Sequence, residues 1–491
     1  MPQSATPHRS IHEAGTDSVL TPSDAQRLSS EGPRSPRVNL LILGASGDLT
    51  RRLLLPGLGT LLLADPERRV RILGAAADDL SDEEWRLRVL QALAEGGCGQ
   101  RGASRLAERS SYTKVDLLSS AAVRDLIAEL GDEPAIIYFA LPPRITRKVL
   151  EVLATIGIGP NIRLGLEKPF GNDLQTAREL NELLHSFADE SQIYRVDHFL
   201  GRSGVLNLLG FRFANRVFEP LWNCTHIESV DIIFDESLAL EGRAAYYDHA
   251  GALIDMIQSH LLLMLALTAM EDLSRLEELE LRDLQTHLLR CVSLWDEDPA
   301  QSSRRARYSA GVVEGKKVPA YVEEKGVNPD NMTETLAEVT VRINNERWAG
   351  VPFRLRSGKA LGKNDRRIVL HFKPVGHLPT GFGPAPGANT LTISLSPEEL
   401  QLDIATNGSG DKFKLERSRM TAVLGESAIR PYGEILGHIM DGDQLLSVRG
   451  DTAEEMWRIL TPVVEAWRNN EVPMHEYSAG THGPDEWDTF V

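Results

Sequence analysis

The sequence predicts an α/β + α+β protein: a doubly wound parallel sheet comes first, and a larger domain with an antiparallel sheet covered by helices follows. Short apolar runs alternate with helical segments up to about residue 197, the pattern of a doubly wound sheet. Beyond residue 198, strands with alternating polar and apolar residues dominate, as in an antiparallel sheet with one covered face. A chain of 491 residues also exceeds the usual size of one compact core.

Three segments are therefore expected. Residues 1–37 are rich in Ser, Pro, Arg and Thr and lack the apolar core of a signal peptide, which predicts a disordered polar tail. Residues 38–197 are expected to form the first domain, and residues 198–491 the second.

In the first domain, continuous apolar runs predict strands that are buried on both faces of the sheet. These strands are expected at residues 38–43, 70–74, 135–141 and 164–167, and helices at 49–58, 82–94 and 145–156. In the second domain, alternation predicts strands at 229–234, 337–343, 367–372 and 390–395. A helix over residues 251–270 is expected to cover one face of that second sheet.

The first strand leads into a turn that contains Gly44 and Gly47. Glycines allow a tight turn in which backbone N–H groups approach a pyrophosphate, and the N-terminus of the next helix favours the anion. This is the start of a Rossmann-like dinucleotide-binding domain. The spacing is G-x-x-G rather than G-x-G-x-x-G, so a strand-turn-helix without a ligand is the alternative.

Two segments place histidines and aspartates close together in the second third of the chain. Residues 194–201 read YRVDHFLG and residues 246–260 read YYDHAGALIDMIQSH, which supply Asp197, His198, Asp255 and His260. A histidine beside a carboxylate can remove a proton from a hydroxyl, because imidazole titrates near neutral pH and the carboxylate fixes its tautomer. The alternatives are a surface turn for the Asp-His pair and a buried structural histidine for His260.

The net charge and the cysteine content exclude several kinds of partner and site. A net charge of −17 argues against nucleic acid or an anionic membrane as a partner, so an anionic substrate needs a local basic site. Three widely spaced cysteines predict neither a disulfide framework nor a metal cluster. The longest apolar stretch, around residues 261–266, is too short to cross a bilayer. A cytoplasmic protein is expected.

Five motifs, in order, resemble those of the glucose-6-phosphate dehydrogenase family. They are GASGDLT at 44–50, EKPFGNDL at 167–174, YRVDHFLGR at 194–202, YYDHAGALIDMIQSH at 246–260 and VPFRLRSGKAL at 351–361. The resemblance implies that the C1 hydroxyl of glucose 6-phosphate is oxidised to 6-phosphoglucono-δ-lactone with hydride transfer to NAD or NADP, the first step of the oxidative pentose phosphate pathway. It also implies a homodimer or homotetramer, with the second domain binding the substrate and forming the interface.

The same resemblance assigns the site residues, without a metal. His260 would be the general base and Asp197 its orienting partner. The implied substrate-binding residues are Lys168, His198, Arg202, Glu236, Asp255 and Lys359. The implied cofactor-binding residues are Gly44, Ala45, Ser46, Gly47, Asp48, Leu49, Arg51, Asp78, Tyr138 and Lys168.

The chain departs from the family pattern around the substrate. Phe199 stands where the family has Tyr and Arg202 where it has Lys; because Phe cannot donate a hydrogen bond, a weaker or rearranged phosphate site is expected. Ile254 stands where Arg is common and Ser396 where Gln is common. These changes leave a dehydrogenase of a different sugar or sugar phosphate as one alternative, and a non-catalytic paralogue as the other.

The choice of cofactor depends on the residues after the second strand. NADP-using members have an Arg there that binds the 2′-phosphate, whereas this chain has Ala77 followed by Asp78 and Asp79. A carboxylate at this place accepts hydrogen bonds from a free ribose hydroxyl and repels a phosphate, which slightly favours NAD. Arg51 or Arg52, reaching from the glycine turn, would instead permit NADP.

Overall fold

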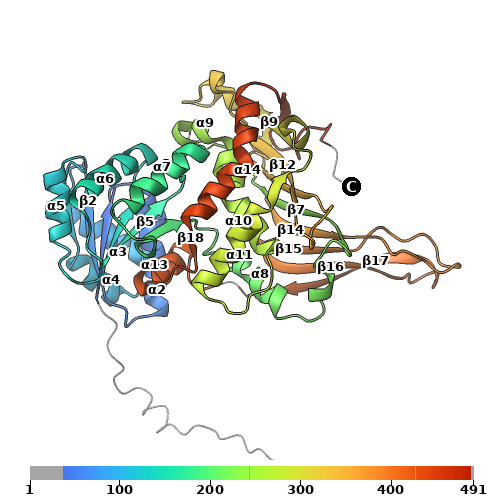
Figure 1. Ribbon diagram of the computed structural model, residues 1–491, viewed down its shortest axis with the longest axis horizontal. Helices are drawn as coiled ribbons and strands as arrows, with labels where there is room; N and C mark the ends of the chain where they lie inside the picture. Colours follow the sequence, from blue (N-terminus) through green and yellow to red (C-terminus); the bar gives the residue numbers. More distant parts are fainter. Residues whose placement is uncertain (1–36, 241, 243, 426, 488–491) are drawn as a thin grey trace, which may run out of the picture.

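The computed structural model describes residues 37–240, 242, 244–425 and 427–487, so the expected tail lies outside the described residues apart from Arg37. Figure 1 shows two sheets side by side, the first at the left and the second at the right. The first sheet has the strand order β18-β6-β5-β4-β1-β2-β3, and only β18 runs antiparallel to its neighbour. Its strands are β1 (Val38–Leu43), β2 (Val70–Ala76), β3 (Ser111–Lys114), β4 (Ala135–Phe139), β5 (Ile162–Glu167), β6 (Ile193–Val196) and β18 (Ser447–Val448).

Helices cover both faces of this sheet, as the apolar runs predict. Along β1, Leu40 and Ile42 belong to one core cluster, whereas Leu41 and Leu43 belong to another. The first cluster involves α2 (Leu55–Ala64), α3 (Asp82–Glu95), α4 (Gln100–Glu108) and α13 (Pro431–Asp441). The second involves α5 (Ser120–Ala128), α6 (Pro143–Ile156) and α7 (Leu174–His185). The doubly wound fold is therefore confirmed.

Part of the chain beyond residue 198 returns to this first layer. Helix α13 packs on α2 so closely that a Cβ added to Gly57 would lie 2.7 Å from the Cβ of Tyr432. Strand β18 then pairs with β6. The first layer is thus built from two separated stretches of sequence, a feature that the alternation pattern does not reveal.

The second sheet has the order β17-β16-β15-β14-β7-β13-β12-β9-β19, and β8 pairs with β12. It is mostly antiparallel as predicted, but β13 runs parallel to β7 and β19 parallel to β9. The strands are β7 (Ile227–Asp235), β8 (Val292–Leu294), β9 (Ser303–Ser309), β12 (Leu336–Ile343), β13 (Phe353–Gly358), β14 (Asp365–Phe372), β15 (Thr390–Leu395), β16 (Glu398–Asn407), β17 (Leu415–Val423) and β19 (Met474–Ser478). A separate hairpin pairs β10 (Gly311–Val313) with β11 (Lys316–Val318).

Helices pack on one face of the second sheet. They include α8 (Ser203–Phe213), α10 (Leu262–Ala269), α11 (Glu278–Arg290) and α14 (Gly450–Arg468). The predicted helix over residues 251–270 is present in a modified form: α9 (Ala244–Ala252) breaks at Gly251, a π-helix spans Leu253–Leu261, and α10 follows. Gly251 has φ +64°, and a Cβ there would lie 2.2 Å from a carboxylate oxygen of Glu334, which explains the break.

One helical stretch among the described residues, Tyr246–Ala269, is long and apolar enough by composition to cross a membrane. It is longer than the short apolar core that the sequence suggests. Most of it is buried inside the protein, where Leu261, Met264 and Leu265 pack in the main core cluster.

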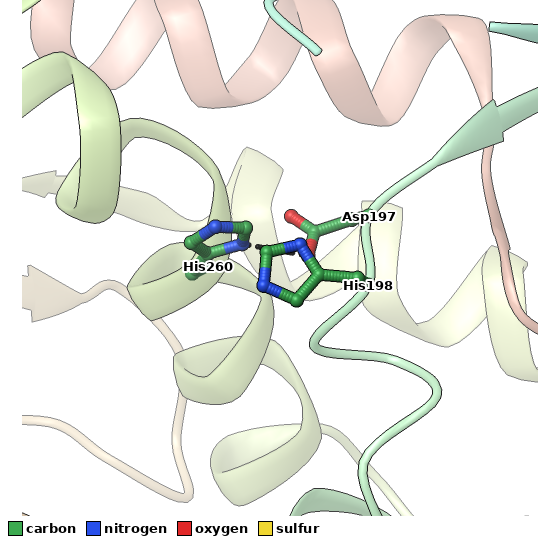
Figure 2. A group of neighbouring side chains, drawn as sticks. All are labelled: Asp197, His198 and His260. Carbon is green, nitrogen blue, oxygen red and sulfur yellow. Dashed lines mark hydrogen bonds and ion pairs between the residues drawn. The ribbon is translucent and has the colours of Figure 1, made fainter. Parts of the chain in front are cut away.

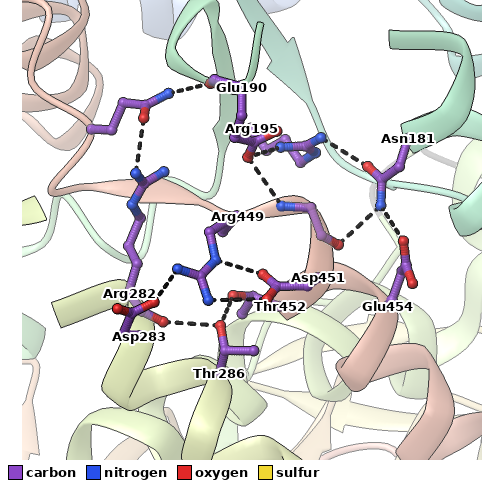
Figure 3. A network of polar contacts seen from close by, with 12 residues as sticks. Asn181, Glu190, Arg195, Arg282, Asp283, Thr286, Arg449, Asp451, Thr452 and Glu454 are labelled. Atoms are coloured by element: carbon purple, nitrogen blue, oxygen red, sulfur yellow. Dashed lines mark hydrogen bonds and ion pairs between the residues drawn. The ribbon is translucent and has the colours of Figure 1, made fainter. Parts of the chain in front are cut away.

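A polar network joins the first sheet to α11 and α14 (Figure 3). The guanidinium of Arg195, buried in β6, donates to Glu190 at 2.7 Å and to Asn181 at 2.8 Å. Asn181 in turn donates to the Gly450 carbonyl at 3.0 Å, at the start of α14. Thr286 of α11 and Thr452 of α14 share a 2.6 Å hydrogen bond. These contacts fix the end of β6 relative to the helices of the second layer.

Candidate active site

The glycine turn has the shape that the sequence predicts for a dinucleotide site. Gly44 has φ +82°, and a Cβ at this position would lie only 2.2 Å from the Ala140 carbonyl oxygen, so no other residue fits. The turn follows β1 at the carboxyl edge of the parallel strands, where ligands of such sheets bind. The next helix begins with a π-helical turn, Thr50–Leu54, before α2. The residues present therefore fit a bound dinucleotide.

Acidic side chains lie beside this turn, as expected. Ala77 and Asp78 are exposed just after β2, and the Ser46 hydroxyl donates a hydrogen bond to the Asp78 carboxylate. Arg51 is exposed and lies 3.8 Å from Asp48, so its guanidinium has only a weak ion pair. Lys114 pairs with Asp79 at 3.0 Å. Both the carboxylate and a reachable guanidinium are thus available at this end of the site.

The two residues predicted to act together in catalysis are in contact, although they come from different layers (Figure 2). Asp197 follows β6 of the first sheet, and His260 lies on the π-helix of the second layer. His260 Nδ1 is 2.6 Å from Asp197 Oδ1, and both side chains are buried. The Phe199 backbone N–H donates to the same Oδ1 at 2.9 Å, which further fixes the carboxylate.

The charges of this pair follow from burial and contact. Burial alone would raise the pKa of Asp197, but the adjacent His260 outweighs it and holds the pKa well below its usual range. Burial lowers the pKa of His260, and the attraction of Asp197 only partly opposes this. An ionised Asp197 accepts a hydrogen bond from Nδ1–H, so His260 is neutral and its Nε2 is left as a base.

His198 and Phe199 pack against His260. The His198 ring lies edge-on to His260 with centroids 4.9 Å apart, and it stacks on Tyr432 at 5.8 Å. The Phe199 ring stacks on His260 at 3.9 Å. Burial, followed by the neighbouring His260, lowers the pKa of His198 to about 3, so His198 is a neutral hydrogen-bonding group at pH 7.

Lys168 lies at the same junction. Its ammonium donates to the Asp255 backbone carbonyl and lies 3.3 Å from the Asp255 carboxylate. The π-helix places Asp255 and His260, five residues apart, on one side of the helix, a distortion often found at functional sites. Burial alone would lower the pKa of Lys168, but Asp255 reverses the effect and keeps the ammonium charged.

Tyr138, which the resemblance places at the cofactor, lies near the carboxyl end of β4. Its side chain is fully buried, and its hydroxyl donates to Glu167 at 2.5 Å. Burial raises the pKa of Glu167 to about 7, which the hydrogen bonds of Tyr138 and Tyr432 partly oppose. Through this hydrogen bond, Tyr138 contacts Glu167, the neighbour of Lys168.

The remaining predicted substrate residues gather at the ends of β7 and β13. Glu236 Oε2 accepts from Lys359 at 2.8 Å, and its Oε1 accepts from Arg366 at 3.1 Å. The Arg202 guanidinium lies 4.5 Å from the centroid of the Phe199 ring and therefore close to the catalytic pair. Of the two other departures, Ile254 packs against the core and Ser396 is exposed between β15 and β16.

Several neighbours of the site were not expected from the sequence. They are Glu167, Tyr246, Arg366 and Tyr432. Tyr246 lies beside Asp255, with its hydroxyl 3.5 Å from the carboxylate. Arg366 could have been found from strand alternation, because it has the parity of the buried Ile368 in β14. Tyr432 could not, because its helix returns to the first layer from a position more than two hundred residues away.

Comparison with known families gives the same assignment for both parts of the chain. Residues 41–207 match the family model "Glucose-6-phosphate dehydrogenase, NAD binding domain". Residues 209–491 match "Glucose-6-phosphate dehydrogenase, C-terminal domain". Among curated relatives, glucose-6-phosphate 1-dehydrogenase of Treponema pallidum is 37% identical over 494 aligned positions, covering 95% of each chain. The enzyme of the same name from Gluconobacter oxydans is 37% identical and covers 91% of this chain and 94% of the relative.

Solved structures agree. The glucose-6-phosphate 1-dehydrogenase of Mycobacterium avium is 32% identical, with a TM-score of 0.80, and covers 92% of this chain and 96% of that one. A glucose-6-phosphate dehydrogenase solved with its substrate glucose 6-phosphate is 28% identical, with a TM-score of 0.83, and covers 93% and 97%. From these matches, together with the motifs and the geometry above, the chain belongs to the glucose-6-phosphate dehydrogenase family.

Proposed function

We propose that the protein oxidises the C1 hydroxyl of glucose 6-phosphate to 6-phosphoglucono-δ-lactone and transfers the hydride to NADP or NAD. The observation that carries this proposal is the His260–Asp197 contact, which joins the layer that carries the glycine turn to the layer that carries the π-helix. Family membership supports the same reaction.

His260 acts as the general base. Its Nε2 takes the proton of the C1 hydroxyl, while Asp197 holds the ring by Nδ1–H and stabilises the imidazolium that forms. When bound, the nicotinamide supplies the chemistry of hydride acceptance from C1. The glycine turn, from Gly44 to Leu49, would hold the dinucleotide at the N-terminus of the helix that follows it. The N–H groups of Gly44, Ala45 and Gly47 donate to carbonyls within the protein and so shape the turn, rather than contact the ligand.

The cationic residues orient the sugar phosphate. Lys168, which stays charged beside Asp255, lies where it can contact both ligands. Arg202 and His198 bind the phosphate, Arg202 by charge and His198 as a neutral donor. Glu236, Asp255 and Lys359 contact sugar hydroxyls, as the family resemblance implies. Asp255 lies beside Lys168 on the π-helix of His260, and Glu236 pairs with Lys359 at 2.8 Å.

NADP and NAD are both acceptable cofactors, with a slight preference for NAD. The Asp78 carboxylate supports NAD, since it can accept from a 2′-hydroxyl as it accepts here from Ser46. The weakly paired Arg51 supports NADP. Ile254 and Ser396 leave open a dehydrogenase of another sugar phosphate, because they remove polar groups relative to the family pattern.

The protein is further proposed to be a cytoplasmic homodimer or homotetramer without nucleic-acid or membrane partners, in line with its net charge of −17. The decisive assay is steady-state turnover with a panel of sugar phosphates and free sugars, each with NAD and with NADP. Preferred oxidation of glucose 6-phosphate supports the proposal. A preference for another sugar rejects the substrate, and a lack of any turnover favours a non-catalytic paralogue.

A further inference from the structure

We propose that Arg366, on β14, is a second phosphate-binding residue, which works with Arg202 and supplies the contact that Phe199 cannot make. The inference rests on the proposed function, because it adds a specificity-determining contact to the same substrate. Nothing in the five motifs points to this residue, which lies outside all of them.

Arg366 lies on the core-facing side of its strand. Side chains alternate along a strand, so Arg366 shares a face with Ile368 and Leu370, which are completely buried. Its cross-strand partner in β7 is Phe234, and the guanidinium lies 4.8 Å from the centroid of that ring. A cation on an apolar face costs free energy unless an anion compensates it.

The protein itself compensates this charge only in part. The nearest carboxylate, Glu236, divides its two oxygens between Arg366 and Lys359. The Arg202 guanidinium also lies over the Phe234 ring, at 5.7 Å from its centroid. The Nε atoms of Arg202 and Arg366 are both buried, and neither has a hydrogen-bond partner among the described residues.

Two guanidinium groups therefore gather at one ring with unused donors. Like charges in a half-buried site repel, and this repulsion is felt at Arg202, whose pKa is lowered by burial and then by Arg366. A ligand that carries two negative charges removes the repulsion and uses the free N–H groups. The fork of a guanidinium fits two oxygens of a phosphate, and two such forks can share one phosphate.

The same site lacks the donors that would otherwise fill this role. Phe199 has no hydroxyl, and burial keeps His198 neutral, so its contribution is a hydrogen bond without charge. Lys168 pairs with Asp255 and Lys359 with Glu236, so the arginines beside Phe234 are left to supply most of the positive charge that a phosphate dianion needs. Arg202 and Arg366 are the two arginines whose guanidinium groups lie over the Phe234 ring in the described part of the chain.

The test compares phosphorylated and free glucose in the full-length enzyme with its cofactor. Arg366→Met, which keeps the length of the stem, should lower the ratio of kcat/KM for glucose 6-phosphate to that for glucose about ten- to hundred-fold. Arg366→Lys should give an intermediate ratio, since it keeps the charge but loses the fork. Arg367→Met is the matched control. The Nε of Arg367 is also buried without a hydrogen-bond partner among the described residues, but Arg367 lies opposite Ile233 on the other face and 3.0 Å from Asp365, so its ratio should stay within about twofold of wild type.

An unchanged ratio in Arg366→Met, with normal turnover in wild type, would overturn the inference and leave the proposed function intact, because it would limit Arg366 to neutralising Glu236. Calorimetric titration with glucose 6-phosphate and with glucose tests the opposite outcome, in which the phosphate contact is real but the proposed reaction is not. If wild type binds only the phosphorylated sugar but does not oxidise it, and Arg366→Met abolishes that preference, the inference stands and the proposed function fails.

Discussion

The two ends of the proposed substrate site, a reactive end and a phosphate end, differ in how their charged groups are paired. At the reactive end, His260 and Asp197 are buried and bonded to each other at 2.6 Å, so the geometry needed for proton transfer exists before substrate arrives. At the phosphate end, Arg202 and Arg366 keep buried Nε donors without partners. The difference shows that a general base needs a partner within the protein, because its ring must already point at the substrate proton when the substrate binds. An anion-binding site needs the opposite arrangement, since its hydrogen-bond donors must remain unpaired until the ligand binds.

The strongest test of the prepared end is His260→Asn. It should lower kcat by a factor on the order of 10²–10⁴, the usual contribution of a general base, with little change in KM. His249→Asn is the control, because His249 is exposed on the preceding helix α9. Near-normal kcat in the His260 variant would mean that the base lies elsewhere.

The unpaired end is tested by Arg202→Ala. Loss of a hydrogen bond to a charged group, about 1.5–3 kcal/mol, should raise KM for glucose 6-phosphate about ten- to hundred-fold while kcat changes far less. Steady-state kinetics with the exposed Arg216→Ala as control measure the split between the two constants. Should the variant retain the wild-type ratio of phosphorylated to free glucose turnover, the phosphate does not bind at Arg202.

The cofactor end resembles the reactive end, because its carboxylate already has a partner: the Ser46 hydroxyl donates a hydrogen bond to Asp78. Ala77→Arg should add a positive partner for a 2′-phosphate and shift relative kcat/KM toward NADP about ten-fold, and up to a hundred-fold. Ala77→Gln is the control: it lengthens the side chain without adding a charge, so it should not shift the preference toward NADP. An NADP preference above about a hundred-fold in wild type would rule out the lean to NAD and favour Arg51 as the phosphate ligand.

The smallest expected effect is on pH dependence. Burial lowers the pKa of His260 from its ordinary value of 6.5, so the base stays neutral, and kcat/KM should hold its plateau, to a pH below 6.5 before it falls. The linkage has the matching sign: the unfolded imidazole binds the proton more tightly, so stability drops as pH falls through 6.5. A pH–rate profile with an acid limb above 6.5 would contradict this environment for the base.

Much of the fold could be predicted because local pattern and burial agree. Strands β1 and β4 are buried on both faces, and their continuous apolar sequences predict this burial. Strand β17 was missed because it is mostly exposed, so its polar sequence carries no alternation. The return of α13 and β18 to the first sheet was missed for another reason, since it depends on contacts remote in sequence.

The site divides in the same way. His260, Asp197 and Lys168 were predicted because they lie within motifs, and the structure brings them together, although their roles stay predictions. Arg366 lies outside the motifs, and its place opposite Phe234 and its hydrogen bond to Glu236 relate it to the site. Tyr138 was placed at the cofactor by resemblance, and its buried hydroxyl donates to Glu167, so its contact with the cofactor stays a prediction.

The network around Arg195 has a consequence for how the protein would lose activity. Asp197 lies two residues beyond Arg195 on the first layer, whereas His260 belongs to the second, so the catalytic contact spans the seam between them. A small slip along this seam would separate base from carboxylate while each layer remained folded. On heating, loss of activity is then expected before global unfolding. The hydrogen bonds of Arg195, Asn181 and Gly450 hold the two layers together, so they should raise the temperature at which activity is lost.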